Sequence, residues 1–313
     1  MTLRLVYRSY GGENHKRRPY YYSKVLTLTS FVQAAARVPS AEVIFLNDGP
    51  IPGPRREIME RFGRVVQIAE TAQGMRASYR ASLGLLRTER WADDDLVAYN
   101  EDDYLYMPDA LVRLVEAAPA LPEASYFSLY GNRPDLNDPL DRIEHGLPRS
   151  WAPAPDLRVG DRVWFNRCSV ASTFAGRVGV IRADLPIFFQ CMVPFRRRFL
   201  DHETGLVYQG YPPYSGKELL LGLPEDFTPS ARGLLRTAVL TPFRVALNVR
   251  ARRQREPHLL YTLTPNEATH LELPVMSPDQ DWEAVAAQVA DWAEANGLGG
   301  QAFTIRESLA RTR

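Results

Sequence analysis

Three consecutive acidic side chains follow a short apolar run near the middle of the chain. Glu101, Asp102 and Asp103 come after the apolar residues 96–99 and before the aromatic-rich residues 104–106. Three adjacent carboxylates repel one another, and a divalent cation or a metal–polyphosphate complex is a common way to neutralise them. An acidic turn that faces water is the other interpretation, and the position of the stretch in the fold decides between the two.

Strands and helices are expected to alternate around these acids. Short β-rich runs occupy residues 3–7, 43–46, 65–68 and 96–99, and segments with helical spacing of apolar residues separate them. This rhythm predicts a parallel sheet, whose ligands bind outside the carboxyl ends of the strands. Arg8 follows the first strand, Asp48 the second and the acids the fourth, so all of them are expected at one edge.

The second half of the chain has a less regular pattern. Residues 119–165 are rich in Pro, Asp and Arg, and residues 172–182 predict a strand before a further helix. Residues 230–255 are apolar and rich in arginine, and predict a surface helix that Pro242 interrupts. We expect a boundary near residue 130, between a donor-binding half (1–130) and an acceptor-binding, catalytic half (131–313) of one continuous domain.

Composition excludes several classes of protein. The chain has 313 residues, 45% of them hydrophobic, and Lys+Arg 38 against Asp+Glu 37, so it is expected to be globular without a general attraction to nucleic acid. Cys168 and Cys191 are too few for a disulfide scaffold or a zinc cluster. With no signal-type amino terminus and no run of about 18 apolar residues, the sequence predicts a cytoplasmic protein with at most peripheral membrane association.

The order of these features resembles the nucleotide-sugar glycosyltransferases of GT-A fold, most closely the family 2 type. In that family an acidic residue follows the second strand and a DxD motif follows the fourth. Asp48 matches the first feature, and residues 101–103 match the second as a Glu-x-Asp variant. The resemblance covers residues 3–118 well and the remainder loosely. It implies a Rossmann-like, mostly parallel sheet flanked by helices, with a mixed α+β acceptor-side half.

By this resemblance the protein transfers a sugar from a nucleoside-diphosphate sugar to an acceptor hydroxyl, expected on a glycan. Asp103 would bind a divalent cation, Mn²⁺ or Mg²⁺, that stabilises the leaving diphosphate. Glu101 or Asp102 would contact the metal or the ribose, and Asp48, with Arg8 beside it, would accept a hydrogen bond from the base. If the acids repel one another, Asp103→Ala is expected to leave the fold intact.

Basic residues and histidines supply further candidates. Arg76 could face the diphosphate, and residues 16–18, Lys-Arg-Arg, are either a phosphate clamp or a solvated run. The resemblance also implies a late histidine in the metal shell, for which His270 is the first candidate and His258 the competitor. An imidazole ligand favours Mn²⁺ over Mg²⁺.

A catalytic base is expected among acids of the second half. Glu203 is the first candidate and Asp201 the second, with Glu225 and Asp226 as later rivals. The alternative is that these acids only balance the charges of residues 196–198, three arginines.

Two other functions remain open from the sequence. A nucleotidyltransferase shares the βαβ half and the metal, and would carry a glycine-rich, basic loop after the first strand; residues 11–18 are a poor version of such a loop. A non-catalytic sugar- or protein-binding module could keep a degenerate transferase fold.

Overall fold

The computed structural model describes residues 1–193, 199–223 and 231–311, and the side chains of the helix that starts at Ala231 are described from Leu235 onward. Glu225, Asp226 and the arginines at 196–198 therefore lie outside the described residues.

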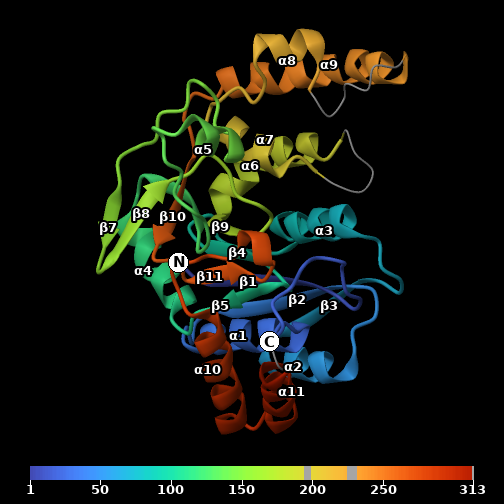
Figure 1. Cartoon of the computed structure of the whole chain (residues 1–313), viewed down its shortest axis with the longest axis vertical. Coiled ribbons are helices and arrows are strands. Elements are labelled where there is room, and N and C mark those ends of the chain that lie inside the picture. Colours follow the sequence, from blue (N-terminus) through green and yellow to red (C-terminus); the bar gives the residue numbers. More distant parts are fainter. Residues whose placement is uncertain (194–198, 224–230, 312–313) are drawn as a thin grey trace.

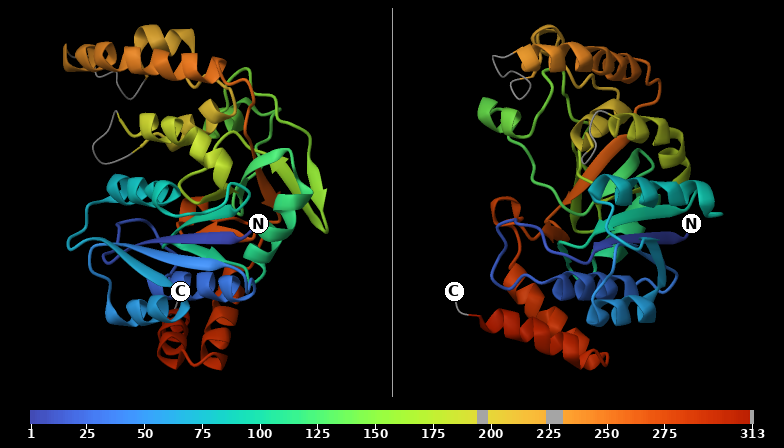
Figure 2. Two further views of the ribbon diagram at one scale, coloured as in Figure 1. Left: turned by 180° about the vertical axis from the view of Figure 1, so that it is seen from behind. Right: turned by 90° about the vertical axis from the view of Figure 1, so that its right-hand side faces the viewer.

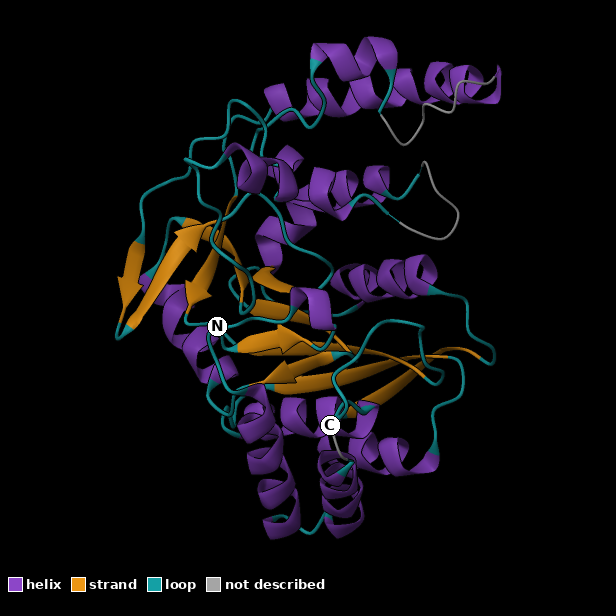
Figure 3. Cartoon of the chain, in the orientation of Figure 1, coloured by secondary structure: helices purple, strands orange, loops and turns teal. Residues whose placement is uncertain are grey.

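A nine-stranded sheet runs through the molecule with the strand order β3-β2-β1-β4-β9-β6-β10-β8-β7 (Figure 3). Its strands are β1 (Leu3–Tyr10), β2 (Glu42–Asp48), β3 (Arg64–Ala69), β4 (Leu96–Glu101), β6 (Ala124–Ser128), β7 (Leu157–Val159), β8 (Arg162–Asn166), β9 (Phe174–Arg177) and β10 (Leu259–Thr264). The pairings make seven of these strands run in one direction, with β8 and β9 reversed. The predicted mostly parallel sheet is confirmed, and it takes strands from both sides of residue 130.

Helices cover both faces of the sheet (Figure 1). Side chains alternate between the faces along each strand, so Leu5 and Tyr7 pack with one set of helices while Val6 packs with the other. The first set is α1 (Lys24–Ala36), α2 (Gly53–Phe62) and α4 (Ala110–Ala120), and the second includes α3 (Met75–Thr88) and α6 (Val178–Cys191). This packing of the sheet between two layers of helices holds the strand ends, where the site lies, in fixed positions.

Two groups of helices extend the molecule at opposite ends (Figures 1 and 2). At one end α10 (Trp282–Ala295) and α11 (Gly299–Ala310) pack against α1, and at the other lie α7 (Asp201–Tyr208), α8 (Gly216–Leu221) and α9 (Ala231–Arg252). The short α5 (Pro139–Glu144) and the 3₁₀ turn η1 (Leu273–Val275) lie in connections. Among the described residues, none of the helices combines the length and the apolar composition that spanning a bilayer requires.

A second, two-stranded sheet positions the site. β5 (Tyr104–Tyr106) follows the acids directly and pairs antiparallel with β11 (Ala268–His270), in a register that sets His270 opposite Tyr104. Residues about 170 positions apart in the sequence are thereby joined by backbone hydrogen bonds, and His270 is delivered to the acidic turn.

The second half differs from the sequence predictions in three places. α6 begins at Val178, so the strand predicted across 172–182 is limited to Phe174–Arg177. α9 continues through Pro242, because burial of Leu247 and Ala251 holds the helix in place around the lost hydrogen bond. α11 was not predicted at all; its first turn contains two adjacent glycines, which weaken the helical signal.

Candidate active site

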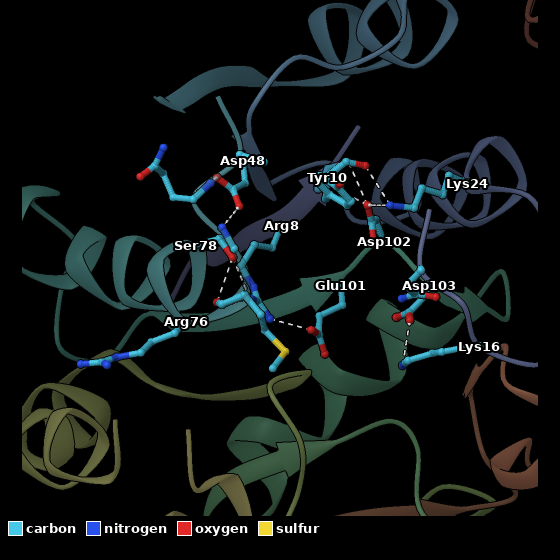
Figure 4. Close-up of a pocket in the computed structure, with 16 residues that line it drawn as sticks. Arg8, Tyr10, Lys16, Lys24, Asp48, Arg76, Ser78, Glu101, Asp102 and Asp103 are labelled. Atoms are coloured by element: carbon cyan, nitrogen blue, oxygen red, sulfur yellow. Dashed lines mark hydrogen bonds and ion pairs between the residues drawn. The ribbon is translucent and has the colours of Figure 1, made fainter. Parts of the chain in front are cut away.

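A pocket of about 620 Å³ opens at the carboxyl ends of β1, β2 and β4 (Figure 4). Strand register accounts for its position, because Tyr10 of β1 pairs with Asp48 of β2 and Arg8 pairs with Glu101 of β4. Six residues singled out from the sequence line it: Arg8, Asp48, Arg76, Glu101, Asp102 and Asp103.

Glu101 is held by Arg8 at the floor of this pocket. Nη2 of Arg8 donates to Oε1 of Glu101 at 2.6 Å and to Oγ of Ser172 at 2.8 Å, while Nη1 donates to Oγ of Ser78 at 3.1 Å. The hydroxyl of Thr173 donates to the second carboxylate oxygen of Glu101 at 3.2 Å. The arginine is only 7% exposed, so this ion pair is a fixed part of the site rather than a surface contact.

Asp102 binds a different cation and anchors the chain after β1. Its Oδ2 accepts hydrogen bonds from the backbone N–H of Tyr10 at 2.8 Å, from Nζ of Lys24 at 2.8 Å and from the hydroxyl of Ser9 at 3.2 Å. The ammonium of Lys24 also donates to the carbonyl of Tyr10 at 2.8 Å. Asp102 therefore fixes the start of the loop that carries residues 11–18.

Asp103 is surrounded by three basic side chains. Its Oδ2 lies 2.9 Å from Nη2 of Arg18, 3.4 Å from Nζ of Lys16 and 2.9 Å from Nε2 of His270. Burial by itself would raise the pKa of Asp103, but the hydrogen bond with His270, the charges of His270 and Lys16 and the hydrogen bond with Arg18 outweigh it and hold that pKa well below its usual range. The carboxylate is thus held in its charged form, with all three basic groups at Oδ2.

His270 lies where the sequence predicted a histidine beside the acids. Its ring stacks on Tyr104 with 5.1 Å between the centroids, and its Nε2 lies 3.0 Å from Nζ of Lys16. The competing candidate, His258, is bound elsewhere, with its Nδ1 2.7 Å from Oδ2 of Asp184. Of the two histidines, only His270 contacts the acidic turn, through Asp103.

Each of the three acids is therefore neutralised by protein cations of its own. The sequence alone suggests that the acids repel one another and does not predict these pairings. Across the described ranges no group of three or more His, Cys, Asp and Glu side chains is arranged to hold a metal ion. Asp103 and His270 nevertheless place an oxygen and an imidazole nitrogen 2.9 Å apart. These two donors fit a divalent ion that takes its remaining ligands from a bound diphosphate and water.

Asp48 closes the other end of the pocket. Its two carboxylate oxygens accept hydrogen bonds from the backbone N–H groups of Gln73 at 2.7 Å and Gly74 at 2.8 Å. Gly74 has φ +93°, a conformation that favours glycine, and it caps the amino end of α3. Arg76, in the first turn of that helix, lines the pocket and extends away from the acids (Figure 4).

The two proposed bases lie outside this pocket, in the first turn of α7. Asp201 borders a small neighbouring cavity together with Tyr79, whose ring centroid lies 5.2 Å from the guanidinium carbon of Arg8. Burial raises the pKa of Asp201 above its usual value. Oε1 of Glu203 accepts a hydrogen bond from the hydroxyl of Tyr214 at 3.1 Å.

Several residues that build the site were not identified from the sequence. Lys24 had a usable signal, because a lysine inside an otherwise apolar and hydroxyl-bearing helix requires a buried carboxylate partner. Ser78, Ser172 and Thr173 had none, since isolated hydroxyl residues are common and only the packing of β9 beside β4 brings Ser172 to Arg8 and Thr173 to Glu101.

Comparisons with known proteins give similarities to solved structures only. No family model matches the chain, and no curated protein matches its sequence. A structure of Staphylococcus aureus TarS residues 1–349 is 14% identical with a TM-score of 0.41, over 100% of this chain and 74% of that one. The chain spans only 39% of the longer TarS structure.

Further structures show the same level of similarity. The galactosyltransferase LgtC in complex with donor and acceptor sugar analogues is 14% identical, TM-score 0.42, over 92% of this chain and 95% of that one. Mycobacterium tuberculosis glucosyl-3-phosphoglycerate synthase with Mn²⁺, UDP and its glucosylated compound is 14% identical, TM-score 0.35, over 59% and 64%. A 4-diphosphocytidyl-2C-methyl-D-erythritol synthase also matches, at 14% identity and TM-score 0.36, over 77% and 97%. All of these TM-scores lie below 0.5, so the chemistry of this chain rests on its own residues.

Proposed function

We propose that this protein is a glycosyltransferase, which moves a sugar from a nucleoside-diphosphate sugar to an acceptor hydroxyl on a glycan. The observation that carries the proposal is the pocket at the carboxyl ends of β1, β2 and β4, where Asp48 at one end and Asp103 with its cations at the other are bridged by Arg8 and Glu101. Ligands of open α/β sheets bind at this edge.

The two ends of the pocket suit the two ends of a nucleoside diphosphate. We assign the nucleoside to the end formed by Asp48 and the Gln73–Gly74 backbone, and the diphosphate to the end where Lys16 and Arg18 lie. Diphosphate is an anion, and the two basic side chains are placed to bind its oxygens once they leave the carboxylate. Asp102, fixed by Lys24, is assigned with Glu101 to the ribose side.

Asp103 and His270 are the proposed ligands of a divalent cation, Mn²⁺ or Mg²⁺. Such an ion, when bound, stabilises the negative charge on the departing diphosphate. Glu101, the third predicted ligand, would have to leave Arg8 to reach it, and the 2.6 Å ion pair makes that exchange unfavourable. Lys16 and Arg18 contact Oδ2 of Asp103, the same oxygen that His270 contacts, so a diphosphate that draws these two cations away is expected to favour metal binding there.

Glu203 and Asp201 remain the proposed candidates for the base that deprotonates the acceptor. Tyr214 donates a hydrogen bond to Glu203. Asp201 borders the small cavity that Tyr79 also lines, and the ring of Tyr79 lies against the guanidinium group of Arg8. A raised pKa brings a carboxylate closer to the range in which it accepts a proton effectively.

Calorimetric titration with UDP, GDP, CDP, dTDP and ADP, each with and without Mn²⁺, tests the proposal. One nucleotide is expected to bind much more tightly with Mn²⁺, and Asp103→Asn should remove the metal effect. Lys217→Met, on exposed α8, is the matched control that should bind as the unmodified protein does. Binding of none of the nucleotides in either condition would contradict the proposal and favour a non-catalytic module.

A nucleotidyltransferase is the second candidate, because the basic loop after β1 does reach the acidic turn through Lys16 and Arg18. The two activities differ in the product released. A nucleotidyltransferase joins a sugar phosphate to a nucleoside triphosphate and releases pyrophosphate from the triphosphate. A glycosyltransferase instead releases a nucleoside diphosphate from a nucleotide sugar. Coupled assays for the two products separate them.

A further inference from the structure

Helix α9 lies at the end of the molecule opposite α10 and α11 (Figure 1). An exposed apolar stripe runs along it. Leu235 and Val239 are each 66% exposed, Val245 is 41% exposed and Val249 is 37% exposed. At 100° per residue these side chains fall on one side of the helix. Exposed small residues fill the same side: Ala238, Pro242 and Ala246.

The opposite side of α9 anchors the helix to the body of the protein. Leu247 and Ala251 are buried in the core that α9 shares with α7. Asn248 accepts a hydrogen bond from the backbone N–H of Tyr214 at 3.0 Å and donates one to its carbonyl at 2.6 Å. Because this face is fixed by burial and by hydrogen bonds, the helix cannot rotate to bury the stripe.

The charge around the stripe has a single sign. Residues 231–255 contain seven arginines and no aspartate or glutamate. Arg236, Arg252 and Arg253 are exposed, and the guanidinium groups of the last two make no hydrogen bond or ion pair with any other part of the chain that the structure describes. An apolar face bordered by arginines and free of acids is typical of helices that lie in the headgroup region of a membrane.

A pocket between α6 and α9 adds a second observation. It has a volume of about 470 Å³ and its lining includes Arg250, Arg253, Gln190 and Gln254, with Val249 of the stripe at its edge. One carboxylate, that of Asp184, also lines it. The Oδ2 atom of that carboxylate is already engaged, by the hydroxyl of Tyr126 at 2.7 Å and by Nδ1 of His258 at 2.7 Å. The amide Nε2 of Gln254 donates to the carbonyl of Glu256 at 3.3 Å, so two guanidinium groups and the amide of Gln190 are left to receive an anion beside the apolar stripe.

We propose that α9 docks the protein on the surface of a bilayer that contains anionic lipids. The leucine and valines of the stripe enter the interfacial region, Arg236, Arg252 and Arg253 face lipid phosphates, and the pocket beside α6 receives one headgroup. This surface is separate from the donor pocket, so the inference stands whether or not the proposed transfer reaction is correct.

Sedimentation with phospholipid vesicles tests this inference. The protein is expected to sediment with phosphatidylcholine vesicles that contain 30% phosphatidylglycerol, to stay in solution with pure phosphatidylcholine, and to bind less at high salt. At about fivefold in affinity per arginine, Arg252→Gln with Arg253→Gln should weaken binding about thirtyfold. Leu235→Glu with Val239→Glu should abolish it.

Matched controls lie elsewhere on the surface. Phe303→Glu removes an equally exposed apolar side chain on α11, and Arg90→Gln removes an exposed arginine after α3; both should bind vesicles like the unmodified protein. Circular dichroism confirms that each variant is folded. Equal binding to neutral and anionic vesicles, or wild-type binding by both stripe variants, would overturn the inference. So would a dimer in light scattering that Leu235→Glu dissociates while no vesicle binding is seen, because the stripe would then be an interface between two copies.

Discussion

Replacing Asp103 by asparagine is expected to destabilise the folded protein. Viewed along the sequence, Asp103 is the last of three repelling acids, and its removal should be harmless or favourable. In the folded chain its Oδ2 instead lies within 2.9 Å of both Arg18 and His270 and 3.4 Å from Lys16. Removing the negative charge takes a carboxylate partner from all three basic groups; Glu272 still lies 3.1 Å from Nζ of Lys16 and 3.7 Å from Nδ1 of His270, whereas Arg18 keeps hydrogen bonds to neutral oxygens of Leu271 and Asn14.

The structure sets the size of the effect. Asp103 and Arg18 side chains are each only 10% exposed, so their pair resembles a buried one, for which loss of one partner costs about 3–5 kcal/mol. Lys16 is 36% exposed, and its contact is worth about 0–1 kcal/mol after solvent screening. Asparagine retains one acceptor oxygen, so we expect a net loss of about 2–3 kcal/mol in the free energy of unfolding.

Urea unfolding at several pH values measures this loss. The pKa of Asp103 is depressed in the folded state, so its contribution is complete above the unfolded-state pKa of about 3.9 and declines as the pH falls below it. The difference between the two proteins should be about 1 kcal/mol smaller at pH 3 than at pH 7. Asp291→Asn, which breaks the exposed pair with Arg306, is the control and should cost less than about 1 kcal/mol. An Asp103→Asn protein as stable as the unmodified one at pH 7 would refute the reasoning and restore the repulsive interpretation.

Three further predictions concern the pocket and the proposed catalytic base. Lys16→Met frees one contact of Asp103 and should tighten Mn²⁺ binding in the absence of nucleotide about fivefold, measured as free Mn²⁺ by electron paramagnetic resonance; a decrease in affinity would argue against Asp103 as a ligand. Gly74→Ala should cost about 1–3 kcal/mol in unfolding experiments and weaken nucleotide binding, because φ +93° is unfavourable for alanine although no atom lies within 4 Å of the added methyl group. Gly53→Ala, equally open but without positive φ, is its control. Replacing the true base by its amide (Asp201→Asn or Glu203→Gln) should lower kcat at least about 100-fold while donor binding is retained. If both amide variants are as active as the unmodified protein, neither residue is the base.

Local patterns gave good predictions of the first half of the chain. Residues 3–7, 43–46, 65–68 and 96–99 all lie within strands of the sheet, because each is a compact β-rich run between segments with helical periodicity. The second half was harder to predict. Its strands are short, β9 and β6 pair across a gap of almost fifty residues, and α9 keeps its helix through a proline by burying one face.

The residues that gather in the pocket were predictable for the same reason. Asp48 and Glu101 end parallel strands and Arg8 lies near the end of a third, and the geometry of a parallel sheet brings such positions to one edge. Ser172 was not predictable, since its contact with Arg8 depends on how the segment before β9 packs against that edge; Lys24 had a signal in its sequence context, but its partner Asp102 followed only from the packing of α1.

The sequence by itself determined the order of strands and helices in the first half of the chain, the placement of the acids at a strand end and the absence of acids among the arginines of α9, because these follow from local propensity and composition. Only the tertiary structure decided the charge state of the acidic turn. Arg8, Lys24, Arg18 and His270 are separated from the acids by about 80 to 170 residues, and only folding brings them within hydrogen-bonding distance. Electrostatic interaction depends on distance in space, so a stretch that looks repulsive along the chain is compensated in the folded protein.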